Sequence, residues 1–354
     1  MKIINSLSLL ILSMLALSCG GDSEDTTSEY SLELNPNSTE FKLGDNLQVH
    51  LNASAGKKID SVVYYLGNTR LEKTDKGDLN YTFQNEKLGR WPLRAKIYSN
   101  ANMEQVEQEI TLYNNVAPVT YTYEVINSYP HATDAYTQGL EFYNGQLYES
   151  TGHYGQSSLR KVDLETGEVL QSIEVPSNYF AEGITIINDK IYQLTWKEGV
   201  GFIYDVNSFE KLGEFAYHQS NEGWGLTHNE NYMFKSDGTE NIWLLDPETQ
   251  AEKSFIQTVT NRTIATQLNE LEWIDGKIYA NTYQKNGVAI INPENGAIEG
   301  VINFDGLKER LNNASSLDPV NDVLNGIAYN SATGKLYVTG KNWDTLFEVE
   351  IKEK

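Results

Sequence analysis

The sequence predicts an all-β protein: a five-bladed β-propeller preceded by a small immunoglobulin-like β-sandwich. The chain has 354 residues, and its 22 tyrosines and many β-branched residues favour sheet over helix. Its first part runs in short alternating segments, whereas the remainder repeats one short motif. Five copies, centred on Gly139, Gly183, Gly225, Glu270 and Gly326, follow one another in steps of 44, 42, 45 and 56 residues. Steps of this size are typical of propeller blades.

The N-terminus predicts a lipoprotein signal peptide over residues 1–18. One basic residue, Lys2, precedes an apolar run over residues 7–17, which is too short to span a bilayer and is typical of a secretion signal. Cys19 follows this run and is the only cysteine, so it cannot form an intrachain disulfide. The segment resembles a bacterial lipobox, which implies a lipid-modified Cys19 at the mature N-terminus. The alternative is an ordinary signal peptide with an incidental cysteine.

Residues 19–29 are predicted to form a flexible tether, because this stretch is polar and acidic. An acidic stretch directly behind the lipid cysteine resembles the surface-export tethers of Bacteroidetes-type lipoproteins. We therefore expect the protein in the bacterial cell envelope, attached to the outer membrane through a lipid anchor at Cys19. It would face either the periplasm or the medium.

Residues 30–114 are predicted to form the immunoglobulin-like sandwich. Alternating segments such as residues 47–51, 61–66 and 94–98 are separated by polar turns at intervals of about ten residues. No titratable residues group there in a way that indicates chemistry, so we expect a spacer or a docking surface. Residues 115–120 form the predicted linker, because Pro118 cannot continue a strand ladder.

Residues 121–354 are predicted to form the propeller. The strands expected in the first blade are residues 140–143, 146–150, 158–164 and 169–175. Hairpin turns such as Asn144-Gly145 and Asp275-Gly276 separate first and second strands. The last blade contains only three strands, over residues 326–329, 335–339 and 346–351. The spare segment 121–126 is therefore expected to supply the fourth strand and to close the ring.

The charge of the chain excludes some partners. The formal net charge is −22 and no cluster of five or more basic residues is present. Electrostatics therefore argue against nucleic acid and against charge-driven docking on anionic lipid. We expect a monomer.

The repeat predicts that candidate functional side chains gather at one mouth of the propeller. The inner strand of each blade lines the central channel and the second strand runs antiparallel to it, so the start of one and the end of the other lie together. The first ring of residues is Gln138, Glu182, Trp224, Asn269 and Asn325. The second ring is Gly152, Trp196, Gly238, Tyr283 and Lys341, with Tyr136 and Phe180 adding to the wall.

These rings predict one pocket with aromatic walls and a few convergent polar groups, the composition of a small-ligand or catalytic site. The alternative is that the same side chains only tie neighbouring blades together. No catalytic metal is expected, because the five histidines show no paired ligand spacing and no second cysteine is available. Neither a G-x-S-x-G elbow nor a Walker loop is present, and no cofactor is expected.

Several motifs are similar to those of the plant-type glutaminyl cyclases, also called glutamine cyclotransferases. They lie at residues 136–140, 149–162, 180–185, 222–226, 268–272 and 338–343. The resemblance covers about residues 121–351. It implies a five-bladed propeller that converts the N-terminal glutamine of peptides or proteins to pyroglutamate with release of ammonia, as a metal-independent aminoacyltransferase.

The resemblance also implies roles for individual residues. Glu182 would transfer protons, and the polar binding groups would be Gln138, Asn269 and Lys341. The pocket wall would consist of Trp196, Trp224, Phe180 and Tyr136, together with Tyr283. Two positions depart from the family, since Tyr136 stands where the plant enzymes carry Phe and Tyr283 where they carry Trp. The pocket is therefore expected to be more polar here.

The chemistry of cyclisation agrees with one carboxylate in an aromatic pocket. A neutral α-amine attacks the side-chain amide, so a base must take a proton, donors must bind the oxyanion, and an acid must protonate the leaving ammonia. Burial of Glu182 should raise its pKa towards neutrality and suit it to both proton transfers. Lys341 would either stabilise the oxyanion or keep Glu182 ionised.

Two other functions compete with catalysis. A propeller without activity could bind peptide or glycan ends at the same mouth. The lipid anchor and the sandwich could also make the protein chiefly a component of envelope assembly. Retention of Glu182 together with the amide residues favours the enzyme.

Overall fold

The computed structural model describes residues 29–55, 57–100 and 102–354, and within them the chain is all-β. The predicted signal peptide, Cys19 and most of the predicted tether lie outside these residues. The helical segments in the described chain are two short 3₁₀ turns, η1 (Lys308–Arg310) and η2 (Ala314–Ser316). Over these same ranges, no helix has the length and apolar character needed to cross a membrane.

Two sheets at the N-terminal end share one core, and we call this part the sandwich. The smaller sheet has the order β1-β3-β6 and consists of β1 (Tyr30–Asn35), β3 (Asn46–Ala53) and β6 (Leu79–Thr82). The larger sheet has the order β2-β8-β7-β4-β5 and consists of β2 (Glu40–Lys42), β8 (Asn102–Tyr113), β7 (Gly89–Ser99), β4 (Ser61–Leu66) and β5 (Thr69–Thr74). The side chains alternate between the core and the solvent, and Leu47, Val49 and Leu51 of β3 point into the core.

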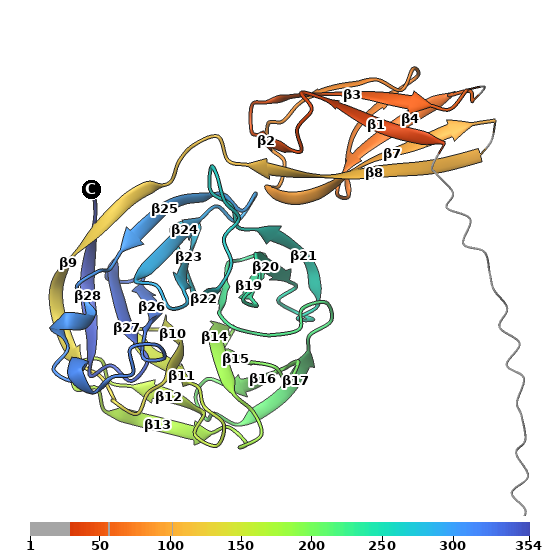
Figure 1. The fold of residues 1–354 in the computed structure, drawn as a ribbon. Helices are drawn as coiled ribbons and strands as arrows, with labels where there is room; N and C mark the ends of the chain where they lie inside the picture. The colour runs from red at the N-terminus through yellow and green to blue at the C-terminus, as the bar shows by residue number, and fades with distance from the viewer. Residues whose placement is uncertain (1–28, 56, 101) are drawn as a thin grey trace, which may run out of the picture.

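The remaining strands form a ring of sheets around a central axis (Figure 1). Three sheets have four antiparallel strands each. They consist of β10 (Thr137–Tyr143), β11 (Gln146–Thr151), β12 (Ser158–Val162) and β13 (Val169–Glu174), then β14 (Ala181–Ile187), β15 (Lys190–Thr195), β16 (Val200–Asp205) and β17 (Lys211–Ala216), then β18 (Leu226–His228), β19 (Met233–Ser236), β20 (Asn241–Leu245) and β21 (Glu252–Gln257).

The fourth sheet of the ring has eight strands in the order β22-β23-β24-β25-β9-β28-β27-β26. These are β22 (Leu268–Ile274), β23 (Lys277–Thr282), β24 (Gly287–Ile291), β25 (Ile298–Asn303), β9 (Val119–Pro130), β28 (Thr345–Glu353), β27 (Lys335–Gly340) and β26 (Leu324–Asn330). It combines two four-stranded antiparallel units, and a short parallel pairing between β25 and β9 joins them.

The predicted closure of the ring by its first strand is confirmed. β9 pairs antiparallel with β28 from Tyr121 opposite Glu353 to Pro130 opposite Thr345, so the two ends of the ring lie in one ladder (Figure 1). The strand is longer than the predicted segment 121–126, and it begins at Val119, inside the predicted linker. Pro118 stands immediately before the strand, where its missing N–H removes no ladder bond.

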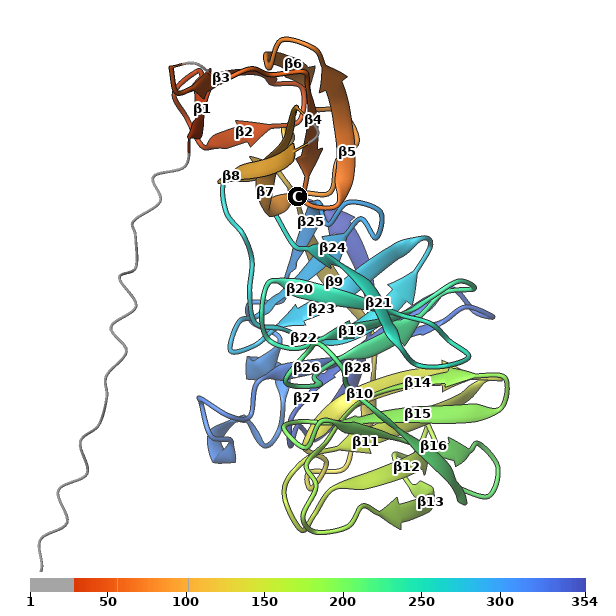
Figure 2. The same ribbon diagram turned by 90° about the vertical axis from the view of Figure 1, so that its right-hand side faces the viewer.

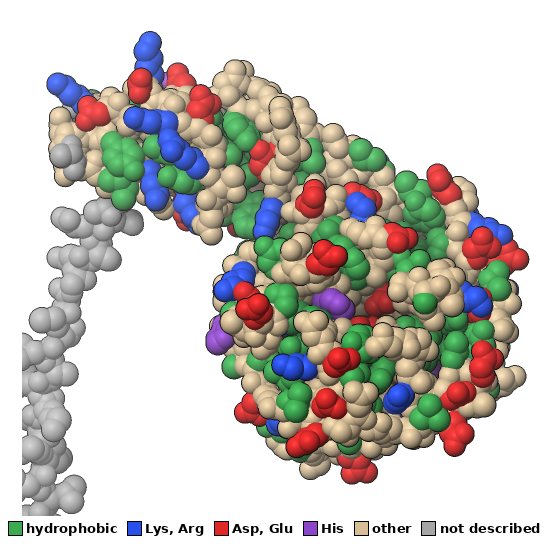
Figure 3. Space-filling view, turned by 180° about the vertical axis from the view of Figure 1, so that it is seen from behind, with side chains coloured by type: hydrophobic (Ala, Val, Ile, Leu, Met, Phe, Trp, Pro, Cys, Tyr) green, Lys and Arg blue, Asp and Glu red, His purple; other side chains and the backbone are tan. Residues whose placement is uncertain are grey.

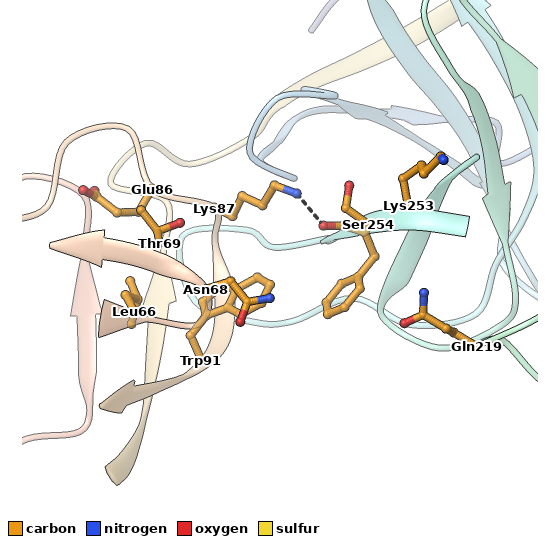
Figure 4. A pocket seen from close by; sticks show the side chains of 10 residues that line it. Leu66, Asn68, Thr69, Glu86, Lys87, Trp91, Gln219, Lys253 and Ser254 are labelled. Atoms are coloured by element: carbon orange, nitrogen blue, oxygen red, sulfur yellow. Dashed lines mark hydrogen bonds between the residues drawn. The ribbon is translucent and has the colours of Figure 1, made fainter. Parts of the chain in front are cut away.

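The sandwich docks on the ring through β7 and the residues before it (Figure 2). Trp91 stacks on Phe255 with ring centroids 5.5 Å apart, and Lys87 Nζ donates to the Phe255 carbonyl at 2.8 Å (Figure 4). The Gln257 side chain bridges both backbone groups of Arg90, accepting from its N–H at 2.7 Å and donating to its carbonyl at 3.2 Å. Backbone, aromatic and charged contacts together hold this junction.

We expect deletion of residues 120–127 to destabilise the entire ring, because β28 would lose most of its antiparallel partner and present an open edge. Thermal unfolding followed by circular dichroism should show a clearly lower melting temperature for the deletion. The matched control is Ile126→Ala, since the Ile126 side chain is 53% exposed and its loss should change little. A deletion protein that melts like the unaltered chain would contradict the closure.

Candidate active site

The predicted mouth is built by a repeated backbone contact. In four units the residue after the second strand donates its N–H to a carbonyl just before the first strand. These bonds run from Gly152 to Tyr136 at 2.8 Å, Trp196 to Phe180 at 2.9 Å, Tyr283 to Gln267 at 2.8 Å and Lys341 to Val323 at 3.0 Å. The two predicted rings of residues therefore do lie at the same mouth.

Each polar residue of the first ring, Gln138, Glu182, Asn269 and Asn325, lies in a β-bulge. The pairing between first and second strands skips from Thr137 to Gly139, and the same irregularity recurs at residues 181–184, 268–271 and 324–327. A bulge leaves an extra residue out of the ladder and re-aims its side chain. The bulges thus release these four side chains from the inner strands at the mouth.

The glycines of the repeated motif allow the inner strands to approach each other. A Cβ on Gly139 would come within 2.6 Å of the Ile184 nitrogen, and one on Gly183 within 2.6 Å of the Leu226 nitrogen. The approach is close enough for the Gly183 N–H to donate to the Trp224 carbonyl at 2.7 Å. Glycine is needed at these positions because no side chain fits between neighbouring strands.

Nine of the twelve residues in the two predicted rings and the predicted wall line one cavity of about 230 Å³. They are Tyr136, Gln138, Phe180, Glu182, Trp196, Trp224, Asn269, Tyr283 and Lys341, and Asn321 joins them. Asn325, the remaining polar member of the first ring, lies behind this layer and donates to Gln138 Oε1 at 3.0 Å. Its contact fixes the orientation of the Gln138 amide, whose Nε2 therefore faces Glu182.

Glu182 is the central carboxylate of the cavity and is 4% exposed. Its Oε1 accepts from Gln138 Nε2 at 3.0 Å, whereas its Oε2 is buried without a hydrogen-bond partner in the described chain. Burial raises the pKa of Glu182 well above its usual range, Lys341 opposes this shift, and the Glu222 and Glu198 carboxylates add to it. The predicted direction of the pKa shift is confirmed.

Lys341 is the buried cation of the site. Its Nζ lies 4.7 Å from the Tyr136 ring centroid and 5.1 Å from that of Tyr283, so two aromatic faces hold the charge. Burial lowers the pKa of Lys341 to about 8, against the opposing influence of Glu182 and Asp322. The ammonium therefore titrates close to neutral pH.

The aromatic wall is organised around Glu222. One oxygen of this carboxylate, Oε2, accepts the indole N–H of Trp196 at 2.7 Å and that of Trp224 at 2.8 Å. Phe180 meets Trp196 edge to face at 5.5 Å, and Tyr283 meets Trp224 in the same way at 5.8 Å between centroids. A single acidic side chain thus sets the position of both tryptophans.

A buried ion pair shapes the loop that carries Glu222. Lys235 Nζ lies 2.9 Å from Glu252 Oε1, and both side chains are at most 1% exposed. The other oxygen of Glu252 accepts the backbone N–H groups of His218, Gln219 and Ser220 at 3.2, 2.5 and 3.1 Å. Charge-assisted hydrogen bonds to the Glu252 carboxylate therefore fix the position of this loop.

Two residues of the site were not predicted from the sequence. Asn321 reaches the cavity from the irregular segment between β25 and β26, and the long step of 56 residues to Gly326 was the only signal of this insertion. Glu222 belongs to the motif at residues 222–226. Its contact with two indoles depends on the pairing of distant segments, which spacing does not reveal.

Comparison with known proteins agrees with this geometry. Residues 96–351 match the model of the family described as glutamine cyclotransferase. The chain is similar to the glutaminyl-peptide cyclotransferase of Arabidopsis thaliana, with 38% identity over 233 residues that cover 65% of this chain and 71% of the plant protein. It is also similar to the crystal structure of the Myxococcus xanthus glutaminyl cyclase, with 35% identity and a TM-score of 0.63, covering 67% of this chain and 99% of the other.

The match extends over most of the chain and includes every residue that lines the cavity. It begins within β7 of the sandwich, so the greater part of the sandwich lies outside it. This chain belongs to the glutamine cyclotransferase family.

Proposed function

We propose that the protein is a glutaminyl-peptide cyclotransferase in which Glu182 is the general acid and base. The observation that carries this assignment is a pair of buried oxygens in one aromatic cavity, Glu182 Oε2 and Asn269 Oδ1, to which no group of the described residues donates a hydrogen bond. Buried acceptors in native proteins normally have partners. An N-terminal glutamine supplies the missing donors through its α-amine and its side-chain amide.

The reaction forms one bond and breaks one bond. The nitrogen of the neutral α-amine attacks the side-chain carbonyl carbon, the carbon–nitrogen bond of the amide breaks, and ammonia leaves. Glu182 takes the proton that the amine loses and passes it to the departing nitrogen, so no net proton is consumed. Burial raises the pKa of the Glu182 carboxyl, and a carboxyl group with a raised pKa is a stronger base when ionised than an ordinary carboxylate.

Lys341 and the amides act on the developing charge. A protonated Lys341 in a desolvated pocket stabilises an oxyanion more strongly than it would in water. The same charge opposes the rise in the pKa of Glu182 that burial causes. Gln138 Nε2, already bound to Glu182, orients the carboxylate between the amine and the leaving group.

The aromatic wall accelerates the reaction by orienting the glutamine side chain. Because attack is intramolecular, a side chain held folded back on its own amine reacts without further loss of freedom. Phe180, Trp196 and Trp224 confine the aliphatic part of the glutamine, and the Glu222 contact keeps the two indoles in place. The hydroxyl groups of Tyr136 and Tyr283 add the polarity that distinguishes this pocket.

We also infer the finer classification of the fold. Three four-stranded sheets and the two four-stranded halves of the eight-stranded sheet support a five-bladed β-propeller. The two sheets of the sandwich support an immunoglobulin-like module.

On grounds of sequence, we also propose a signal peptide, lipid attachment at Cys19, a place in the outer membrane and a monomeric state. Acidic side chains are spread over one face of the ring, which suits a protein that avoids polyanions (Figure 3).

Glu182→Gln should abolish the activity and keep the fold. The amide retains an oxygen for Gln138 but cannot shuttle a proton, so kcat should fall by about 10²–10⁴-fold. The assay is ammonia release, with the matching mass loss, from a short peptide that begins with glutamine. Glu230→Gln, at an exposed position in the turn between β18 and β19, is the matched control and should behave like the unaltered protein. Near-normal turnover by Glu182→Gln would refute the role of this residue.

Chelators should leave turnover unchanged, because protein groups alone account for each proposed proton transfer and for oxyanion binding. The experiment compares initial rates before and after prolonged incubation with EDTA or 1,10-phenanthroline. Strong inhibition that added metal reverses would disprove metal independence.

Turnover should rise towards about pH 8 and fall above it. The α-amine must be neutral to attack, and its ordinary pKa of about 7.7–8.0 sets the rising limb. The pKa of Lys341, lowered to about 8, sets the falling limb, because the ammonium is present below this pH and is lost above it. Lys341→Arg keeps its charge and should move the falling limb to higher pH, whereas Lys341→Met should lower kcat throughout. An unmoved falling limb in Lys341→Arg would exclude Lys341 as its source.

A further inference from the structure

We propose that a second groove, beside the active-site cavity, binds the residue that follows the glutamine and selects a cationic side chain there. The inference rests on the proposed function and names the peptides that the enzyme prefers. The groove has a volume of about 350 Å³, and Trp224 lines both it and the active-site cavity. One indole ring therefore forms the partition between the two spaces.

The position of the groove suits the next residue of a peptide. The glutamine occupies the buried cavity, so its α-carbonyl must lead the rest of the chain out across the rim. Gly238 lies under the Trp224 ring at the rim, and a Cβ there would come within 2.6 Å of that ring. The indole thus packs against the backbone. A long side chain on the residue after the glutamine passes over this indole into the groove.

The walls of the groove are acidic and hold their charge rigidly. Asp237 is 7% exposed, and its carboxylate accepts from Thr239 N at 3.0 Å, Thr239 Oγ1 at 2.5 Å and Trp243 Nε1 at 2.7 Å. Glu222 is held by two indole N–H groups. All of these donors are neutral, so hydrogen bonding orients both carboxylates without cancelling their charge.

The nearest buried cation does not neutralise the groove. Lys235 lies beneath the loop and is paired with Glu252. Lys235 contributes one positive charge, whereas Glu252, Glu222 and Asp237 contribute three negative charges. The groove and its surroundings therefore keep two net negative charges. On the other side of the cavity, Lys197 lies over the Trp196 ring at 3.7 Å. Glu198, the next residue in the chain, offsets this charge, and its carboxylate acts on Glu182. The Trp196 side therefore has no net charge, and a cationic substrate residue is directed to the Trp224 side.

The composition of the groove is complementary to lysine or arginine. Two fixed carboxylates provide the ion pairs, and Trp224 provides an aromatic face of the kind that binds cations best. Asn221 and Gln267 add neutral polar groups at the walls. An acidic side chain at the same position would be repelled, so discrimination arises from repulsion as well as attraction.

The test compares three peptides on the complete protein: Gln-Lys-Ala-Phe, Gln-Ala-Ala-Phe and Gln-Glu-Ala-Phe. At low salt we expect kcat/KM for the lysine peptide to exceed that for the glutamate peptide by about 10-fold or more, because charge pairs at a partly buried rim contribute on this scale. The ratio should shrink at high ionic strength. Equal kcat/KM values for the three peptides would overturn the inference while leaving the proposed function intact.

Two variants attribute the preference to the groove. Asp237→Asn should reduce the lysine-to-glutamate ratio about 3-fold or more, and Asn221→Asp, at an exposed wall position, should increase it. Glu230→Gln changes the net charge by the same amount as Asp237→Asn and should leave the ratio unchanged. A ratio that responds equally to Glu230→Gln would assign the preference to overall charge and overturn the groove. Absence of ammonia from all three peptides would overturn the proposed function and the subsite with it.

Discussion

The close approach of the inner strands is the constraint on which the ring and its site depend. Where Gly183 donates to the Trp224 carbonyl, the backbones of neighbouring units touch, and a methyl group would not fit between them. Strands this close leave no room for side chains along the contact. The β-bulges at the same motif turn the polar side chains of the mouth out of the strand ladder. The packing that closes the ring therefore also places the polar residues of the site.

Burial affects several carboxylates of the ring, but hydrogen bonding separates the structural ones from the candidate catalyst. Burial raises the pKa of Glu270 and Glu272 well above the usual range and that of Glu141 to about 8. Each of these three accepts a backbone N–H of a neighbouring inner strand, namely that of Ile327, Tyr329 or Ile186. They tie units together. Glu182 also has a raised pKa, but it lines the cavity, and one of its oxygens has no hydrogen-bond partner among the residues that the structure describes.

The acidic groups around the mouth have distinct tasks despite their shared charge. Glu252 neutralises a buried lysine and holds a loop, and Glu222 on that loop positions two indoles. Asp237 lies beyond them, in the groove proposed for the next substrate residue. The loop that carries Glu222 and Trp224 thus connects the wall of the active-site cavity with the wall of this groove, so the geometry of the two is not independent.

The sequence by itself determined the all-β class, the repeat, the closing role of the first ring strand and all nine residues of the cavity that were named. These depend on periodic local patterns: a glycine motif every 42 to 56 residues and hairpin turns at fixed offsets place equivalent side chains at one mouth. Only the tertiary structure decided that Asn321 enters from an irregular insertion, that Glu222 binds both Trp196 and Trp224, and that β9 begins at Val119. These features arise from contacts between segments far apart in the chain, which follow from packing and leave no period in the sequence.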